Sequence, residues 1–257
     1  MGKVIAIFNQ KGGVGKTTTN VNLSACIAEK GKKVCVIDID PQGNTTSGLG
    51  VDKNILENTI YDIIIGETNI KGVIVDTEYE NLHLIPSSVQ LAGAEIELTG
   101  MKNREIKLKQ AINEIKEDYD YIFIDCPPSL GLLTINSLAA VDSVLIPIQC
   151  EYYALEGVSQ LMNTIQLIKK NLNPKLEIQG VVLSMFDGRT NLSIQVVDEV
   201  KNYFKGKVYT TIIPRNVRLA EAPSFGQPII YYDVRSKGAE AYTDLAEEFL
   251  DLEEDVI

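Results

Sequence analysis

The residues best able to do chemistry lie near the N-terminus, in the segment NQKGGVGKTTT at residues 9–19. This segment follows a short apolar run and precedes a stretch with helical periodicity. Its glycines let backbone N–H groups turn toward an anion, and the N-terminus of the following helix adds about half a positive charge. The pattern therefore predicts a loop that binds phosphate groups. The predicted loop residues are Lys11, Gly12, Gly13, Val14, Gly15, Lys16, Thr17 and Thr18.

The polar side chains of this loop have distinct expected roles. We expect Lys16 to reach the β and γ phosphates of a nucleotide, the Thr17 hydroxyl to ligate Mg²⁺ and Thr18 to contact the α phosphate. The usual G-x-x-x-x-G-K-[ST] pattern has glycine at position 10, where this chain has Gln10, and Lys11 adds a second cation. A lysine at that point does not easily fold back onto its own nucleotide. We therefore expect Lys11 to reach phosphate that is bound by a second copy of the chain.

Two carboxylates follow a second apolar run. Asp38 and Asp40 are two residues apart, so they point to the same side while the strand lasts, and Pro41 and Gly43 then turn the chain away. Ligands bind at the carboxyl ends of strands in open α/β sheets. We expect Asp40 to position or deprotonate an attacking water, and Asp38 to lie nearer the metal and act on it indirectly. An acid that caps backbone N–H groups of a turn is the alternative interpretation of Asp40.

Asp125 ends the apolar run YIFID at residues 121–125, as a Walker-B carboxylate does. We expect it to hold Mg²⁺ through water in the metal's coordination shell. Glu151 also has a type of side chain that can act in catalysis, but no partner for it can be identified in the sequence. A surface acid is therefore the favoured interpretation of Glu151.

Short runs rich in Val and Ile alternate with segments of helical period, which is typical of β-α-β units around a parallel sheet. The sequence predicts a single α/β domain over residues 1–257, with a P-loop-type, mostly parallel sheet flanked by helices on both faces and an acidic C-terminal helix at about 238–252. The predicted strands are residues 3–8, 33–38, 82–85, 121–125, 143–148, 179–185 and 208–213. The predicted helices are residues 16–30, 104–118, 154–170, 192–204 and 238–252.

Composition excludes several classes of protein. The 257 residues are 45% hydrophobic and 23% charged, close to the average for soluble globular chains, so collagen-like and disordered classes are excluded. No apolar run approaches the roughly 18 to 20 residues that span a bilayer, and the N-terminus has no cleavable signal pattern, so we expect a cytoplasmic protein. The cysteines are isolated, without a C-x-x-C pair, and we expect them to be small buried hydrophobes. They are Cys26, Cys35, Cys126 and Cys150.

Charge is distributed unevenly along the chain. The net charge of −11 argues at first against nucleic acid as a partner. However, residues 185–238 carry eight Lys and Arg against five Asp and Glu, whereas residues 239–257 carry eight acidic side chains and no basic one. An ordinary solvated surface fits this local excess equally well, so charge alone does not identify a partner.

With these motifs in place, the chain resembles the deviant Walker-A ATPases of the ParA/MinD family, and within them the chromosomal Soj/ParA proteins. The resemblance runs from about residue 3 to residue 250. It is carried by KGGVGKTT in the loop, DIDPQGNTTSGLG (38–50), YDYIFIDCPPSLG (119–131), IPIQCEYYALEG (146–157) and IPRNVRLAEAPSFGQPI (213–229).

This resemblance implies a P-loop NTPase fold and a weak Mg²⁺-dependent ATPase with ATP and Mg²⁺ as cofactors. It implies an ATP-sandwich homodimer, with Lys11 entering the partner's site and Asp40 as the catalytic residue. The segment CPPSLG after Asp125 resembles the family's second switch loop, which senses the γ phosphate. Pro214 and Asn216 match adenine-contacting positions, and Met185 is either the other wall of the adenine site or plain core.

The resemblance also implies what the nucleotide switch controls. Arg189 and Arg218 match the DNA-binding arginines of Soj-like proteins, so we expect the ATP-bound dimer to bind double-stranded DNA nonspecifically on the nucleoid. A ParB/Spo0J-type partner would stimulate hydrolysis and release, in chromosome partitioning and in control of replication initiation or sporulation.

Two other outputs are weighed against DNA binding. The first is a MinD-like ATPase that recruits a protein partner at the membrane or cell pole, but the acidic C-terminus disfavours anionic lipid, and we expect no membrane partner. The second is an iron–sulfur electron-transfer ATPase, for which Cys126 lacks a second obvious ligand.

Overall fold

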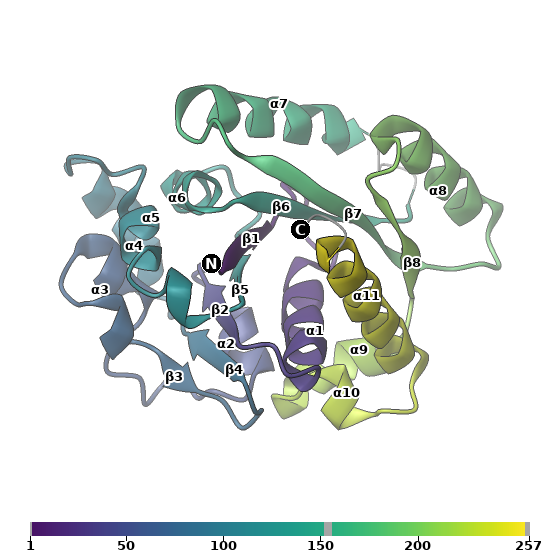
Figure 1. The fold of residues 1–257 in the computed structure, drawn as a ribbon, viewed down its shortest axis with the longest axis horizontal. Helices are drawn as coiled ribbons and strands as arrows, with labels where there is room; N and C mark the ends of the chain where they lie inside the picture. The colour runs from purple at the N-terminus through teal and green to yellow at the C-terminus, as the bar shows by residue number, and fades with distance from the viewer. Residues whose placement is uncertain (1, 152–155, 255–257) are drawn as a thin grey trace.

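Eight strands form one sheet in the computed structural model, which describes residues 2–151 and 156–254 (Figure 1). The order across the sheet is β3-β4-β2-β5-β1-β6-β7-β8, and every neighbouring pair is parallel except β3 with β4. The strands are β1 (Lys3–Ile7), β2 (Val34–Asp38), β3 (Val75–Asp76), β4 (Leu82–Ile85), β5 (Tyr121–Asp125), β6 (Ser143–Gln149), β7 (Glu177–Phe186) and β8 (Val208–Pro214). The predicted fold class is confirmed.

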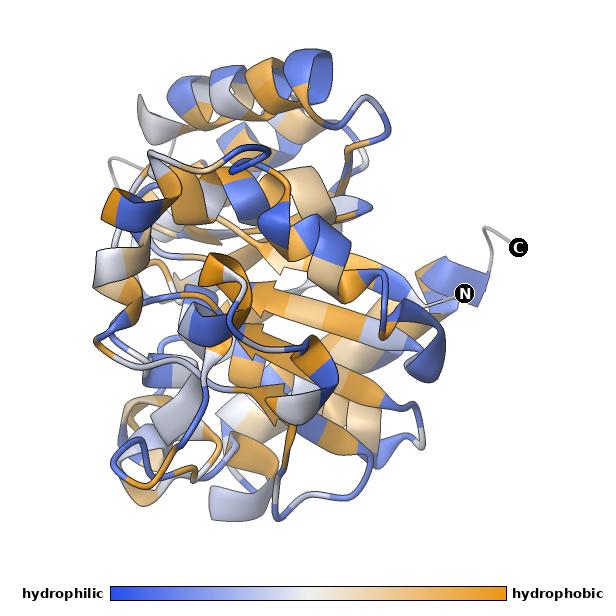
Figure 2. Cartoon of the chain, turned by 90° about the vertical axis from the view of Figure 1, so that its left-hand side faces the viewer, coloured by the Kyte–Doolittle hydropathy of each residue, from blue (hydrophilic) through white to orange (hydrophobic). Residues whose placement is uncertain are grey.

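Helices cover both faces of the sheet and bury one hydrophobic core on each. Along β1, Val4 and Ala6 belong to the core under α3 to α8, whereas Ile5 and Ile7 belong to the core under α1 and α11. Figure 2 shows the apolar strands inside and the polar stretches of the helices on the outside. The helices are α1 (Lys16–Glu29), α2 (Asn44–Gly48), α3 (Ile60–Ile65), α4 (Leu91–Leu98), α5 (Lys107–Ile112), α6 (Leu132–Ala140), α7 (Glu156–Asn171), α8 (Asn191–Phe204), α9 (Val217–Glu221), α10 (Ile229–Tyr232) and α11 (Lys237–Glu254), with short 3₁₀ turns at Ile70–Gly72, Lys116–Asp118 and Ala222–Phe225.

Each of the predicted strands is present, with ends that differ by at most two residues. The edge strand β3 was not predicted, because two residues are too few to form a pattern. Among the predicted helices, α1, α8 and α11 are confirmed to within two residues at either end. Helix α7 begins at Glu156, and residues 154 and 155 of its predicted range lie outside the described residues.

The prediction of one helix over residues 104–118 is wrong. The carboxamide of Asn136 on α6 donates to the Arg104 carbonyl at 2.7 Å and accepts from the Leu108 N–H at 3.2 Å. These two backbone groups are the pair that would bond to each other in a continuous helix. Helix α5 therefore begins only at Lys107, and it ends at Ile112, after which the chain continues in 3₁₀ geometry.

All four cysteines are free and buried, as expected of small hydrophobes. Burial raises the pKa of the Cys126 thiol to about 12, so it stays protonated near neutral pH. Within the described residues, no helix has the length and apolar composition needed to cross a membrane.

Helix α11 closes the core on the α1 side. Phe249 is fully buried against Tyr121 and Phe123 of β5, with ring centroids 5.3 and 5.9 Å away. Near the start of α11, the Tyr242 hydroxyl shares a buried hydrogen bond of 3.2 Å with Thr19 Oγ1 on α1. The helix that follows the phosphate loop therefore depends on the C-terminal helix for part of its packing.

We expect Phe249→Ala to lower the free energy of unfolding by about 3–5 kcal/mol, because it removes a fully buried ring and leaves a cavity. Leu252→Ala on the same helix is the matched control, since Leu252 is 46% exposed; its cost should be about 1 kcal/mol or less. Chemical denaturation followed by circular dichroism measures both values. Equal losses for the two variants would contradict this account of the core.

Candidate nucleotide-binding site

The phosphate loop joins β1 to α1 at the carboxyl edge of the sheet, and neighbouring strands hold it in place. Gly13 and Gly15 have φ of 74° and 90°, the left-handed region that side chains other than glycine rarely adopt. The Ser184 hydroxyl of β7 donates to the Val14 carbonyl at 2.8 Å. On the other side, the Asn9 amide donates to the Pro147 carbonyl at 2.8 Å. These bonds hold the loop to the strands on either side of it.

A pocket of about 570 Å³ opens beside this loop. Its walls come from the phosphate loop, the segment after β2, the CPPSLG segment after β5 and the end of β7. Lining residues are Gly12, Gly13, Gly15, Lys16, Thr17, Thr18, Asp40, Pro41, Gln42, Asn44, Pro127, Pro128, Ser129 and Met185. Motifs far apart in the sequence therefore meet around one cavity.

Lys16 is buried at the floor of the loop. Its Nζ donates to the Lys11 carbonyl at 3.1 Å, and burial lowers the pKa of its ammonium. An ammonium has three donors, so one backbone bond leaves donors for an anion in the pocket. Lys11 itself is half-buried; its carbonyl accepts from Lys16, and its N–H donates to Asn9 Oδ1 at 3.0 Å.

Asp125 and Asp38 lie side by side, because β2 and β5 pair in that register. Asp125 Oδ2 accepts from Thr17 Oγ1 at 2.7 Å and from Thr45 Oγ1 at 2.8 Å. Its Oδ1 is buried and has no hydrogen-bond partner among the described residues. Asp38 Oδ2 accepts from the N–H and the hydroxyl of Thr46, at 2.8 and 2.7 Å.

Burial raises the pKa of both carboxyls, and the charge of Asp125 raises that of Asp38 further. An unpartnered carboxylate oxygen next to a second buried carboxylate suits a divalent cation, and Mg²⁺ prefers such oxygen ligands. The residues present therefore fit a magnesium ion near Asp125 and Thr17, with Asp38 as the neighbouring carboxylate of Asp125.

The geometry of Asp40 is compatible with both interpretations of its role, and its part in catalysis stays a prediction. Its Oδ1 accepts from the Gln42 N–H at 2.9 Å, which is the turn-capping bond of the simpler interpretation. The same side chain borders the phosphate pocket, where a carboxylate that activates water must lie.

The three predicted adenine contacts lie near one another but not all in the pocket. Met185 is half-buried, lines the pocket and has a φ of 52°, and its contact with adenine stays a prediction. Pro214 pairs with Phe186 across β7 and β8, next to Met185, but it does not line this pocket. Asn216 Oδ1 accepts from the Arg218 N–H at 2.8 Å and caps α9.

Thr45 and Thr46 are site residues that the sequence interpretation missed. They are fully buried on α2 and hold Asp125 and Asp38, respectively. The available signal was a pair of hydroxyl residues directly after a strand-end carboxylate motif, but such residues are common in turns and helix starts.

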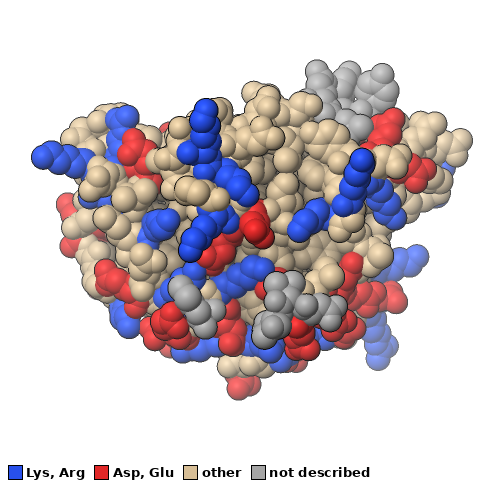
Figure 3. Space-filling model, turned by 45° about the horizontal axis from the view of Figure 1, so that its top comes forward, with Lys and Arg blue, Asp and Glu red and all other residues tan. Residues whose placement is uncertain are grey.

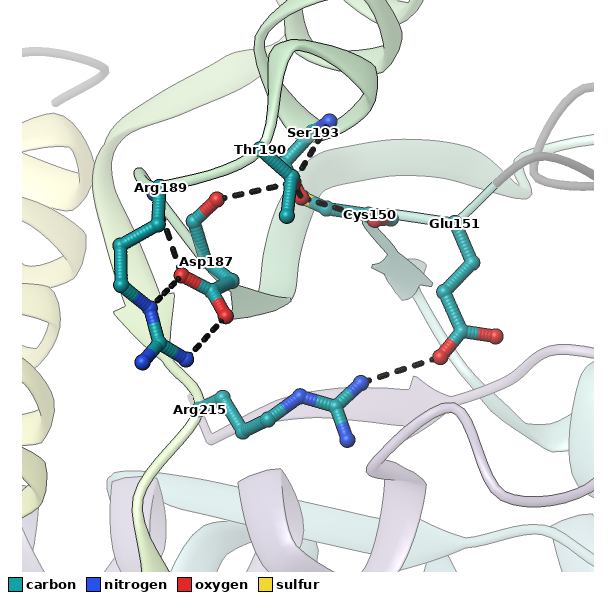
Figure 4. Close-up of polar contacts among 7 residues, drawn as sticks. All are labelled: Cys150, Glu151, Asp187, Arg189, Thr190, Ser193 and Arg215. Carbon is teal, nitrogen blue, oxygen red and sulfur yellow. Dashed lines mark hydrogen bonds and ion pairs between the residues drawn. The ribbon is translucent and has the colours of Figure 1, made fainter.

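The predicted DNA-contacting arginines lie on the surface, and acidic partners hold both of them. Arg189 donates to Asp187 at 2.6 and 2.8 Å, and Arg218 pairs with Glu221 at 2.8 Å and with Asp233 at 3.3 Å. Figure 4 shows Arg189 and the neighbouring Arg215, which binds Glu151 at 3.0 Å.

Glu151 is therefore a partly exposed surface acid, as favoured from the sequence. On the face seen in Figure 3, basic side chains occur in small groups with acidic ones between them.

Comparison with known proteins identifies the family. The sequence profile of a family described as AAA domain matches residues 2–178. The sporulation initiation inhibitor protein Soj of Bacillus subtilis is 63% identical over 248 residues, which cover 96% of this chain and 98% of that protein. The chromosome partitioning protein ParA of Myxococcus xanthus is 53% identical over 250 residues, covering 97% of this chain and 88% of the relative.

Among solved structures, cobyrinic acid a,c-diamide synthase from Mycobacterium smegmatis with bound ADP and magnesium superposes on this chain with a TM-score of 0.85 and is 36% identical in sequence. The match covers 96% of this chain and 93% of the synthase chain. The resemblance seen in the sequence motifs is thereby confirmed, and the chain belongs to the Soj/ParA family of chromosome partitioning proteins.

Proposed function

We propose that this protein is an ATP-dependent switch for chromosome partitioning, active in the cytoplasm on the nucleoid. The observation that carries the proposal is the pocket at the phosphate loop. There the buried Lys16 ammonium lies close to Asp125, whose Oδ1 has no hydrogen-bond partner among the described residues. Support also comes from the high identity to Soj and ParA proteins over nearly the whole chain.

Nucleotide binding rests on the loop side chains. In this proposal Lys16 binds the β and γ phosphates, Thr18 contacts the α phosphate, and backbone N–H groups of residues 12–15 complete the cradle. Thr17 and Asp125 hold Mg²⁺, the latter through water, and Asp38 supports them indirectly. A bound Mg²⁺ would supply positive charge that offsets the phosphates and the two carboxylates. Met185, Pro214 and Asn216 contact the adenine.

Hydrolysis requires Asp40 to orient or deprotonate a water at the γ phosphate. Asp40 borders the pocket, and one of its carboxylate oxygens accepts from the Gln42 N–H. Lys11 of a second copy completes the site in an ATP-sandwich homodimer. Because the site is incomplete in one copy, hydrolysis is slow and coupled to dimerisation.

DNA binding follows from dimerisation. Arg189 and Arg218 have exposed side chains, at 86% and 54%, so in this proposal their guanidinium groups exchange their carboxylate partners for DNA phosphates. A dimer presents two copies of these arginines to DNA, so it binds DNA more tightly than one copy does. A ParB/Spo0J-type protein then stimulates hydrolysis and release of DNA.

The central test uses Asp40→Ala, which should bind ATP, lose hydrolysis by about 100-fold or more, and persist as a dimer that binds DNA. Its binding to an unrelated DNA duplex is measured with ATP, with ADP and without nucleotide, at two salt concentrations. Lys16→Ala is the negative control and should bind neither ATP nor DNA. Rapid hydrolysis by Asp40→Ala would remove this residue from catalysis. Nucleotide-independent DNA binding would instead contradict the switch.

Arg189→Glu combined with Arg218→Glu should reduce DNA affinity by about tenfold or more, since removing a cation that binds a DNA phosphate weakens binding and lowers its salt dependence. ATP-dependent dimerisation, measured by size-exclusion chromatography with light scattering, should be unchanged. The matched control, Lys71→Glu with Lys102→Glu, makes the same change in net charge outside residues 185–238. Equal loss of affinity in both double variants would show an effect of overall charge instead of a defined patch.

Asp125→Asn should stabilise the metal-free, nucleotide-free protein by about 1–3 kcal/mol at pH 8 and by about half as much at pH 5, because pH 5 lies between the unfolded and folded pKa values of the wild-type carboxyl. Burial raises the pKa of Asp125 and Asp38 from 3.8 toward about 6 and about 7, so the folded chain binds these protons more tightly than the unfolded chain. Wild-type stability therefore falls as pH rises through this range, and the variant removes much of that fall. Chemical denaturation in the presence of EDTA at both pH values measures the difference in unfolding free energy between the variant and the wild type. Added Mg²⁺-ATP should stabilise the wild type only. A pH-independent difference would contradict this account.

A further inference from the structure

The backbone of Asp40 is held on both sides by buried groups. Its N–H donates to Asp38 Oδ1 at 3.2 Å, and its carbonyl accepts from the Ser87 hydroxyl at 2.8 Å. The same carbonyl also accepts from the Gly43 N–H at 2.9 Å, which closes the turn after β2. Ser87 is fully buried, so water does not compete for its hydroxyl.

Further hydrogen bonds join these two ends into a closed ring. The Ser87 N–H donates to Thr46 Oγ1 at 2.9 Å, and Thr46 Oγ1 donates to Asp38 Oδ2 at 2.7 Å. The ring therefore runs from the Asp40 carbonyl through Ser87, Thr46 and Asp38 to the Asp40 N–H. Asp38, Thr46 and Ser87 are each fully buried.

The fold explains why these groups meet. Strands β2 and β4 are parallel neighbours in which Ile37 pairs with Ile85, and the same register continued by two residues places Ser87 alongside Ile39. That register brings Ser87 next to the residue before Asp40. Gly43 has a φ of 61°, and a Cβ there would lie 3.1 Å from the Ser87 carbonyl, so the turn fits closely against this segment.

We propose that Ser87 and Thr46 are positioning residues for ATP hydrolysis: they fix the backbone of Asp40 so that its carboxylate stays at the edge of the phosphate pocket. This inference rests on the proposed role of Asp40 in hydrolysis. Neither hydroxyl lines the pocket or has a role in holding phosphate. Reaction rates are sensitive to small displacements of a reacting group, and a shift of about 1 Å can cost about 100-fold.

The first experiment replaces Ser87 by alanine and measures kcat and KM for Mg²⁺-ATP together with the affinity for a fluorescent ATP analogue. We expect kcat to fall about 10- to 100-fold, while KM and analogue affinity stay within about threefold of wild type. Ser88→Ala is the matched control, because the neighbouring hydroxyl has no hydrogen-bond partner among the described residues; its kinetics should equal those of the wild type.

Thr46→Val and Thr46→Ser provide an independent second pair. Valine keeps the shape of threonine and removes the hydroxyl, so it should lower kcat as Ser87→Ala does. Serine keeps the hydroxyl and should restore kcat to within about threefold of wild type. A thermal melt of every variant identifies any that do not fold, and the inference is then judged on the other residue.

The outcomes separate this inference from the proposed function. If Asp40→Ala is inactive but Ser87→Ala and Thr46→Val keep wild-type kcat, the positioning role is wrong and the proposed function stands. If the hydroxyl variants lose analogue affinity and kcat in parallel with thermal stability, the ring is merely structural and the inference is overturned. If Asp40→Ala hydrolyses ATP at the wild-type rate, both proposals fail.

Discussion

Two carboxylates, Asp38 and Asp125, are buried next to each other at the carboxyl edge of the sheet, and the buried Lys16 ammonium is close enough to lower the pKa of Asp125. Such a pair is unfavourable unless hydrogen bonds and a counter-charge compensate for it. The short helix α2 supplies two of the hydroxyls and one N–H that do so, and the phosphate loop supplies Thr17 and Lys16. The site is therefore built around two buried negative charges, which protonation or a bound cation neutralises.

Much of this arrangement follows from local sequence. Apolar runs that end in Asp38 and Asp125, and a glycine loop between a strand and a helix, define the sheet and its functional edge. Parallel pairing then brings the strand ends together without further information. This is why the predicted strands and the loop residues agree with the structure.

Tertiary contacts explain what the sequence could not predict. Asn136 separates the backbone groups of Arg104 and Leu108, and no pattern within residues 104–118 indicates that interruption. Thr45 and Thr46 look like ordinary turn residues until the register of β2 and β5 places carboxylates beside them. Similarly, the acidic partners of Arg189 and Arg218 reduce the local positive field, which a count of charges over residues 185–238 only partly indicates.

The contact between α1 and α11 has a consequence for synthesis of the chain. The phosphate loop and α1 are made within the first 29 residues, but the side of the sheet on which α1 packs is completed by Tyr242, Leu245 and Phe249. A nascent chain therefore leaves the ribosome with its nucleotide loop translated and the adjacent core still open to water. Stable folding of the phosphate loop and α1 therefore waits for the last helix to emerge, so a chain stalled before α11 lacks a stably packed nucleotide loop.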